Sequence, residues 1–404
     1  MMPSVLRRVR RVALWIVACV PALGVVLASR LLRRFVLVRF GSFMGDRIGH
    51  LAVNTDLYLC EQDEGINVPQ RRYVDIVFFR GGVCNHQLAT MWKRVLNVAP
   101  SWVLSPVVEL NRKIPGGSAH QVGENTQGAR DVHNLFERRP SHLRFTPPEL
   151  TRGQEEMRQM GIPIGSPFVC LIVRDSEYLD GVAGRDWSYH NYRDSDIRNY
   201  AMAAKELVAR GYWVIRMGAK VKAAFETNNP RIIDYATNGM RNEFMDIFLG
   251  AHCTFCISTG TGWGTIPILF RRPMVYVNDE PIGIIPTSRS CDLFISKKCR
   301  NVTDGRYLTL NEVFATGVGF ARSTRDYEAR GVEPVELSPM EILDVVVEMD
   351  ERLNRRWQEE THDEALQKEF KRLFVKHTQG QSVHGEILAR FGAAFLRENR
   401  WWLE

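Results

Sequence analysis

The sequence lacks the patterns that mark several broad classes of protein. Its eight cysteines are scattered through 404 residues without the spacing of a disulfide framework, which indicates reduced thiols in a cytoplasm. It has no internal repeats, no low-complexity tracts and no basic face interleaved with aromatic residues, so we do not expect nucleic-acid binding. Cys253 and Cys256 form a C-x-x-C pair. Because no second pair has zinc-ribbon spacing, we interpret both as core residues of a buried strand.

Acidic residues are missing before Asp46, whereas arginines are frequent there. The net charge of +7 is therefore largely local and does not by itself indicate a polyanionic partner. The arginines concerned are Arg7, Arg8, Arg10, Arg11, Arg30, Arg33, Arg34 and Arg39.

An apolar stretch, residues 12–29, lies between these arginines and contains Pro21 and Gly24. Its eighteen residues are borderline for crossing a bilayer. A single span and a cleaved signal peptide are the alternatives, but a span would place one arginine cluster on the disfavoured side. We expect residues 1–34 to form an in-plane, monotopic attachment, with both clusters on anionic headgroups of a cytoplasmic membrane face.

Strand-like and helix-like stretches alternate beyond this segment, which predicts a doubly wound α/β fold. We expect two Rossmann-like domains, residues 35–160 and 161–335, followed by helices in residues 336–404 that pack back on the body. In such a fold, ligands bind at the carboxyl ends of the strands. The expected strands are residues 35–40, 74–79, 168–173, 212–217, 254–257 and 274–278, and helices are expected at residues 196–210 and 387–403.

The stretch S-T-G-T-G-W-G follows one of these strands and precedes a helix-sized apolar run that ends at Phe270. Glycines let the backbone turn sharply and approach a ligand closely. The unpaired N–H groups and the dipole of a following helix favour an anion at such a turn. A plain tight connection is the alternative. We predict that a phosphate binds at Ser258, Thr259, Gly260, Thr261, Gly262, Trp263 and Gly264.

Basic residues follow two other expected strands. Arg174 comes directly after residues 168–173, where a guanidinium could bind a pyrophosphate in bidentate fashion. An ion pair with Asp175 or another carboxylate is the alternative. Arg216 and Lys220 flank Gly218 near the end of the next strand and could add positive charge to the same place.

The glycine-rich segment from Gly41 to His50 follows the first strand and contains Asp46. A carboxylate there suits a general base that accepts a proton from a hydroxyl, and a helix cap is the equally supported alternative. His50 is a weaker candidate base. Asp194-Ser195-Asp196 spells D-x-D, but it immediately precedes an expected helix, so we interpret these residues as caps and expect no metal.

Several strings resemble a bacterial family of predicted glycosyltransferases that is tied to surface polysaccharide synthesis. They are D-R-I-G-H-L-A, V-C-L-I-V-R-D-S-E-Y-L from Val169, Y-R-D-S-D-I-R-N-Y from Tyr192, G-Y-W-V-I-R-M-G from Gly211, and the S-T-G-T-G-W-G turn. The resemblance runs from about Arg39 to the C-terminal helix.

More distantly, M-G-D at Met44 to Asp46 is similar to the first loop of lipopolysaccharide heptosyltransferases, in which that aspartate is the proposed base. Thr259-Gly260 is similar to their donor-phosphate turn, although the histidine expected shortly afterwards is absent. Fucosyltransferases of the same broad architecture carry His-x-Arg at a strand end. Arg174 fits the arginine, and Ile172 stands in place of the histidine.

The resemblance implies a two-domain, metal-independent glycosyltransferase of GT-B architecture, with the two domains facing a cleft, at the cytoplasmic face of the inner membrane. Its partners would be a nucleotide-sugar donor, which is a substrate and not a cofactor, and a glycan or lipid-linked acceptor. A nucleotide-sugar epimerase or hydrolase of the same fold is one alternative. A membrane-bound nucleotide-sugar-binding protein without catalysis is another.

Overall fold

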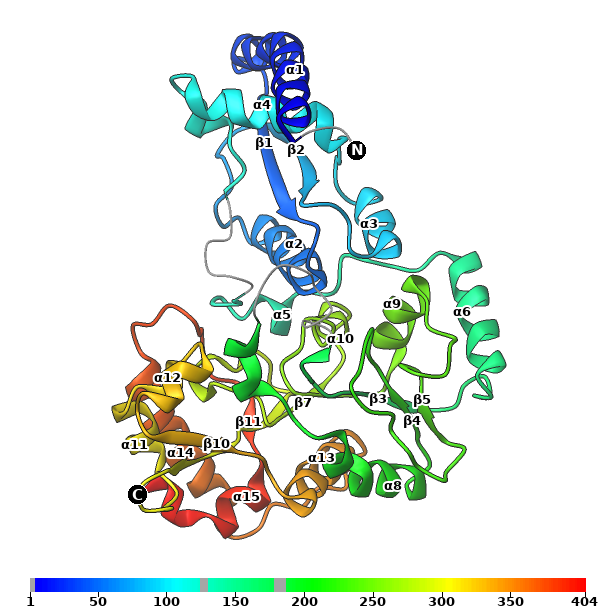
Figure 1. Cartoon of the computed structure of the whole chain (residues 1–404), viewed down its shortest axis with the longest axis vertical. Helices are drawn as coiled ribbons and strands as arrows, with labels where there is room; N and C mark the ends of the chain where they lie inside the picture. The colour runs from blue at the N-terminus through cyan, green and yellow to red at the C-terminus, as the bar shows by residue number, and fades with distance from the viewer. Residues whose placement is uncertain (1–3, 124–129, 178–186) are drawn as a thin grey trace. The chain divides into compact units, whose positions relative to one another are not determined.

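The computed structural model describes residues 4–123, 130–177 and 187–404, shown in Figure 1. The chain divides into two compact units. Unit 1 comprises Met1–Ala129 and His142–Arg144, and unit 2 comprises Arg130–Ser141 and Phe145–Glu404. This division differs from the expected boundary between residues 160 and 161.

Unit 1 is a small α/β unit whose described strands form a two-stranded parallel sheet. This is less than the full doubly wound domain that we expected. Its elements are α1 (Ser4–Leu32), β1 (Leu37–Met44), α2 (Ile48–Asp63), β2 (Tyr73–Arg80), α3 (His86–Lys93), α4 (Ser101–Lys113) and the 3-10 helix η1 (Gly117–His120).

Strand β1 extends four residues beyond the expected end at Phe40 and pairs with β2 along its whole length, from Leu37 opposite Tyr73 to Met44 opposite Arg80. Gly41 therefore lies inside the strand and does not open a loop. Glycine fits this position of the strand because a Cβ at Gly41 would lie 2.7 Å from the Cβ of Val122.

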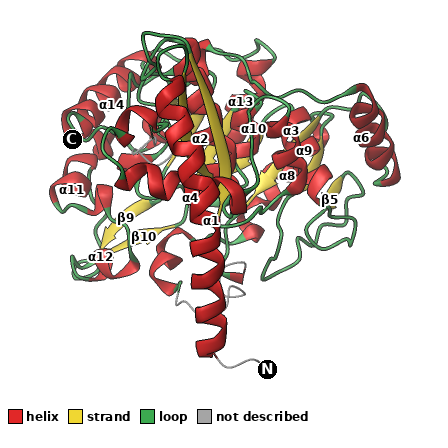
Figure 2. Cartoon of the chain, turned by 90° about the horizontal axis from the view of Figure 1, so that it is seen from above, coloured by secondary structure: helices red, strands yellow, loops and turns green. Residues whose placement is uncertain are grey.

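Helix α1 is part of unit 1, because Ala22 and Val26 are buried in its hydrophobic core. The helix runs through Pro21, and Figure 2 shows it as a single rod. No helix among the described residues combines the length and the apolarity that crossing a bilayer requires. The rest of this core consists of Phe40, Phe78, Leu104, Val107 and Val108, whereas Val20, Leu23, Leu27 and Leu31 are exposed.

Residues 142–144 belong to unit 1 because His142 is held between two carboxylates of α2. Its Nδ1 lies 2.7 Å from Oδ1 of Asp56, and its Nε2 lies 3.0 Å from Oδ2 of Asp63. Phe145, the first residue of unit 2 after this segment, packs with Phe248 and Phe270.

Unit 2 contains a seven-stranded parallel sheet with the order β11-β8-β7-β6-β3-β4-β5. The strand order reverses between β3 and β6, which confirms the expected doubly wound topology for this unit. The strands are β3 (Phe168–Ile172), β4 (Trp213–Arg216), β5 (Ile232–Asp234), β6 (Cys256–Ser258), β7 (Met274–Val277), β8 (Leu293–Ile295) and β11 (Arg390–Phe391).

The remaining elements of unit 2 include an antiparallel pair, β9 (Lys298–Asn301) with β10 (Val332–Val335). The α-helices are α5 (Leu135–Arg138), α6 (Pro147–Gln159), α8 (Ala201–Ala209), α9 (Glu243–His252), α10 (Thr265–Leu269), α11 (Leu310–Ala315), α12 (Thr324–Glu328), α13 (Pro339–Leu353), α14 (Asp363–Thr378) and α15 (Ala393–Glu398). The 3-10 helices are η2 (Ser188–Arg193), η3 (Ile197–Tyr200), η4 (Ile282–Ile284), η5 (Val318–Phe320) and η6 (Arg400–Leu403).

Helix α6, which we assigned to the first domain, packs in unit 2. Gly153 makes this possible, since a Cβ there would lie 2.1 Å from the Phe248 ring of α9. The expected helix over residues 387–403 is also different, because it is divided into β11, α15 and η6. The N–H of Gly392 donates to the carbonyl of Phe294, so this segment adds a strand to the sheet before it becomes helical.

Candidate functional site

Two predicted binding segments meet at the point where the strand order of unit 2 reverses. Arg174 follows β3, and the glycine turn follows β6, which pairs with β3. The backbone N–H of Arg174 donates to Oγ1 of Thr259 at 2.7 Å, and the N–H of Thr259 donates to the Ile172 carbonyl at 3.2 Å. The sheet therefore places the guanidine-bearing residue and the turn side by side.

The turn is shaped by its own hydroxyl groups and glycines. The N–H of Gly264 donates to Oγ1 of Thr261 at 3.1 Å, and Oγ1 of Thr265 donates to the Gly262 carbonyl at 2.7 Å. A Cβ at Gly264 would lie 2.6 Å from the buried Oγ of Ser258. Only glycine fits this position without displacing the serine.

Trp263 anchors the turn to the neighbouring helix. Its Nε1 donates to the carbonyl of Asp246 in α9 at 3.0 Å. Burial raises the pKa of the Asp246 carboxyl to about 6, although the ion pair with Arg241 opposes this shift. The indole N–H is thus engaged by the protein, while the ring is only partly buried.

The helix after the turn is much shorter than we expected. Helix α10 has five residues, Thr265–Leu269, and it ends before Arg271, whose φ is +59°. Because the macrodipole effect needs a run of aligned peptides and the Gly264 N–H is used inside the turn, most positive charge here comes from arginine side chains.

Arg193 is a site residue that the sequence alone did not reveal. It ends η2, and its guanidinium donates to the carbonyl of Gly260 in the turn. The neighbouring Asp194 lies with Oδ1 3.3 Å from Nε of Arg174. An ion pair of Arg174 was an open alternative, and its partner is Asp194, whereas Asp175 accepts from the backbone N–H groups of Glu177 and Lys222.

Asp279 brings a buried carboxylate to the same place from the end of β7. A Cβ at Gly260, whose φ is +69°, would lie 2.0 Å from Oδ1 of Asp279. Burial raises the pKa of Asp279, and the positive charges of Arg193, Arg130 and Arg174 oppose the shift. The guanidinium of Arg130 donates to the carbonyl of Ile284. The available signal was Asp279-Glu280, two acidic residues directly after the strand expected at residues 274–278.

The next residue, Glu280, is also buried. Burial raises its pKa to about 8, so it is largely protonated at neutral pH. The hydroxyl of Tyr327 donates to its Oε2 at 2.8 Å. Glu280 therefore adds little negative charge to this edge of the sheet.

Arg216 and Lys220 do not join this cluster. Arg216 is 1% exposed, and its guanidinium pairs with Asp234 at 3.0 Å and donates to the Ala223 carbonyl at 3.2 Å. The ion pair with Asp234 therefore holds the Arg216 side chain against the neighbouring strand β5. Lys220 lies exposed in the loop after β4. We therefore leave both out of the donor site proposed below.

The D-x-D residues are engaged by arginines. Asp194 pairs with Arg174, and Asp196 accepts from the backbone N–H of Arg198 at 2.9 Å as the N-cap of η3. The helix-capping interpretation holds for Asp196. The thiols of Cys253 and Cys256 are buried in the core, as predicted.

In unit 1, Asp46 is exposed in the short connection between β1 and α2. The N-cap of α2 is Arg47, so Asp46 is not the helix cap that we considered. The N–H of Gly45 donates to the Arg80 carbonyl at 2.8 Å, and a Cβ at Gly81 would lie 2.7 Å from Cγ of Asp46. The Asp46 carboxylate therefore packs against Gly81, the residue that follows β2.

His50, the second candidate base, lies in the first turn of α2. Burial lowers its pKa, and the charge of Arg47 lowers it further. Its Nδ1 lies 3.3 Å from Nδ2 of Asn54. The imidazole is consequently neutral at neutral pH, as a general base must be.

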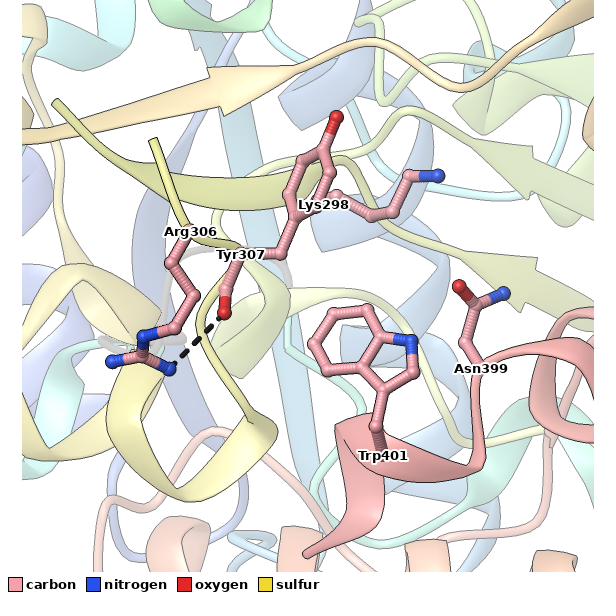
Figure 3. Close-up of a pocket in the computed structure, with 5 residues that line it drawn as sticks. All are labelled: Lys298, Arg306, Tyr307, Asn399 and Trp401. Atoms are coloured by element: carbon pink, nitrogen blue, oxygen red, sulfur yellow. Dashed lines mark hydrogen bonds between the residues drawn. The ribbon is translucent and has the colours of Figure 1, made fainter. Parts of the chain in front are cut away.

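A separate pocket of 420 Å³ lies in unit 2 where β9 meets the C-terminal residues. Figure 3 shows the rings of Tyr307 and Trp401 beside Lys298, Arg306 and Asn399. The ammonium group of Lys298 is 2.8 Å from Oε1 of Glu341. None of the predicted site residues lines this pocket.

Gly260 allows a direct test of how closely the turn and Asp279 pack. Gly239 has a similar φ of +78°, but a Cβ there would meet no atom within 4 Å. Gly239→Ala should cost about 1–2 kcal/mol of backbone strain. Gly260→Ala should cost about 1–3 kcal/mol more, because the new methyl overlaps the buried carboxylate. The free energies of urea unfolding measure both, and equal values would contradict the close packing.

No protein-family model and no curated protein matches this sequence. Among solved structures, it is similar to ADP-heptose lps heptosyltransferase II from E. coli, with 14% identity, 64% of this chain and 90% of that chain covered, and a TM-score of 0.36. It is also similar to a glycosyl transferase family 9 protein from Veillonella parvula DSM 2008, with 10% identity, 64% and 86% covered, and a TM-score of 0.40.

Proposed function

We propose that this chain is a glycosyltransferase that transfers a sugar from a nucleotide-sugar to a glycan or lipid-linked acceptor in bacterial surface polysaccharide synthesis. The observation that carries the proposal is the junction of β3 and β6, where Arg174 and the glycine turn are joined by the hydrogen bond to Thr259. Open α/β sheets bind ligands at such a switch point.

The donor diphosphate would lie on residues 259–264 with Arg174 beside it. Arg193 donates to the Gly260 carbonyl and so places a second guanidinium at the turn. Cations that are already in position when the glycosidic bond breaks stabilise the departing diphosphate without further reorganisation. This chemistry accounts for the positive groups at the end of β3 and η2.

A divalent metal is not required in this proposal. The carboxylates of Asp194 and Asp196 lie against Arg174 and Arg198, and the guanidinium groups would supply the charge that Mg²⁺ or Mn²⁺ supplies elsewhere. Asp46 would accept the proton of the acceptor hydroxyl, because it is exposed and does not cap α2.

Membrane association at the cytoplasmic face is part of the proposal. The outer side of α1 exposes Leu23, Leu27 and Leu31, and arginines lie at both ends of the apolar stretch. Apolar burial would hold the helix in the plane of the headgroups, and each arginine would add about 1 kcal/mol near anionic lipid.

Two other functions fit parts of the same site. An epimerase or hydrolase would convert the nucleotide-sugar without acceptor, and a binding protein would convert nothing. Donor turnover with and without acceptor distinguishes these three activities, since only a transferase depends on the acceptor.

Arg174→Ala should weaken binding of the recognised nucleoside diphosphate by about 2–3 kcal/mol, the scale of a lost charge-assisted bidentate contact. Titration calorimetry with UDP, GDP, ADP and dTDP measures this. Arg158→Ala is the matched control, because Arg158 is an exposed arginine paired with Glu155 on α6. Unchanged affinity in a folded Arg174→Ala protein would remove Arg174 from the donor site.

Asp46→Asn retains the size of the side chain but removes its basicity. Turnover should fall roughly 10²–10⁴-fold, the usual share of general base catalysis, while donor affinity stays the same. Steady-state rates and calorimetry on the same preparation separate the two effects. Near-normal turnover would show that Asp46 is not the base, and His50→Gln would be measured next.

Replacing Leu23, Leu27 and Leu31 together by serine should greatly reduce cosedimentation with phosphatidylglycerol-rich vesicles, since each buried leucine is worth about 1.5–3 kcal/mol. Ile164→Ser combined with Val302→Ser is the control, because both residues are exposed and apolar in unit 2. Equal sedimentation of the two variants would rule out α1 as the attachment surface.

A further inference from the structure

Arg174 and Arg193 contact the turn after β6, and Arg130 contacts η4, which follows β7. Arg174 follows β3, Arg193 ends η2, and Arg130 begins the segment before α5. Arg193 and Arg130 donate to the backbone carbonyls of Gly260 and Ile284. Carbonyl oxygens satisfy hydrogen-bond donors but do not neutralise a guanidinium charge.

These arginines repel one another. Burial lowers the pKa of Arg174, and the positive charge of Arg193 lowers it further. Burial likewise lowers the pKa of Arg130, Asp279 opposes the shift, and Arg322 and Arg193 add to it. Like charges held together away from water destabilise the fold unless a negative group lies among them.

Asp279 is the buried carboxyl group beside the turn, and the positive charges of Arg193, Arg130 and Arg174 oppose the rise in its pKa that burial causes. Its carboxylate lies where a Cβ of Gly260 would be, next to the residue whose carbonyl accepts from Arg193. Asp194 adds a second carboxylate beside Arg174. Three guanidinium groups face these two carboxylates, so positive charge remains in excess. Glu280 does not offset it because burial keeps its carboxyl largely protonated at neutral pH.

We propose that Arg130 and Arg193 join Arg174 in binding both phosphates of a nucleoside diphosphate sugar, and that Asp279 is the counter-ion of these arginines while the site is empty. The inference rests on the proposed function and adds to it Arg130 as a phosphate-binding residue and Asp279 as the counter-ion. The ligand phosphates and the Asp279 carboxylate compete for the same guanidinium groups.

This competition predicts a gain of affinity. Asp279→Asn keeps the size of the side chain beside Gly260 and removes its negative charge. The nucleoside diphosphate and inorganic pyrophosphate should each bind several-fold more tightly. A purely structural Asp279 would give unchanged or weaker binding, and that result would overturn the counter-ion role. If the variant does not fold, Asp279→Ser is measured in the same way.

Arg193→Gln tests the ligand class. It removes the guanidinium charge, while the amide can still donate to the Gly260 carbonyl. Calorimetry should show at least about tenfold weaker binding of the nucleoside diphosphate, with a smaller change for the matching monophosphate. Arg198→Gln is the control, since Arg198 is exposed and pairs with Asp196. Equal losses for diphosphate and monophosphate, or no loss, would overturn the role of Arg193.

The wild-type protein separates failure of this inference from failure of the proposed function. If neither the four nucleoside diphosphates nor pyrophosphate binds the wild type, both the donor site and this inference are wrong. If the wild type binds a diphosphate and Arg193→Gln binds it equally well, the donor site stands and only the arginine cluster is wrong.

Discussion

The hydrogen bond from the Arg174 N–H to the Thr259 hydroxyl is the interaction on which the proposed site depends. It joins the carboxyl ends of β3 and β6 at the place where strands are added in opposite directions along the sheet. Helical connections leave the sheet on different sides at such a point and open space at the strand ends. The polar residues after β3, β6 and β7 gather there for that reason.

Electrostatics then sets a second constraint. The guanidinium groups of Arg130 and Arg174 are partly removed from water at this edge of the sheet. The carboxyl group of Asp279 is buried beside them and can offset their positive charge. Gly260 has no side chain where that aspartate sits. The glycine turn thus serves two purposes, since it lets the backbone approach a ligand and leaves space for the carboxylate that holds the arginines.

The sequence predicted the parts of this arrangement that depend on local pattern. Apolar runs indicated the strands of unit 2, and the ends of parallel strands placed Arg174 and residues 258–264 on one edge. It did not predict Arg193, because the approach of Arg193 to the turn depends on η2. Asp279 was missed although it directly follows an expected strand. Arg216 ends β4, next to β3, but it is buried and pairs with Asp234 of the neighbouring strand β5.

The local sequence pattern also did not predict the lengths of the helices or the boundary between the units. The apolar run after the turn indicated a longer helix than α10, which stops where Arg271 adopts a left-handed conformation. The attachment segment and α6 were assigned by composition and position, whereas Val26 and Gly153 show that packing decides which unit they join. Unit 1 keeps the expected alternation of strand and helix in β1, α2, β2 and α3, and its two described strands pair in parallel.

Hydrogen exchange of the intact wild-type chain, with and without a saturating nucleoside diphosphate sugar, tests the central claim most directly. Ligand bound at the switch point should slow exchange of the backbone amides in residues 174–177 and 259–265, because those N–H groups lie at the β3 and β6 ends. Protection that is confined to other strand ends, with no change in these two segments, would contradict the account.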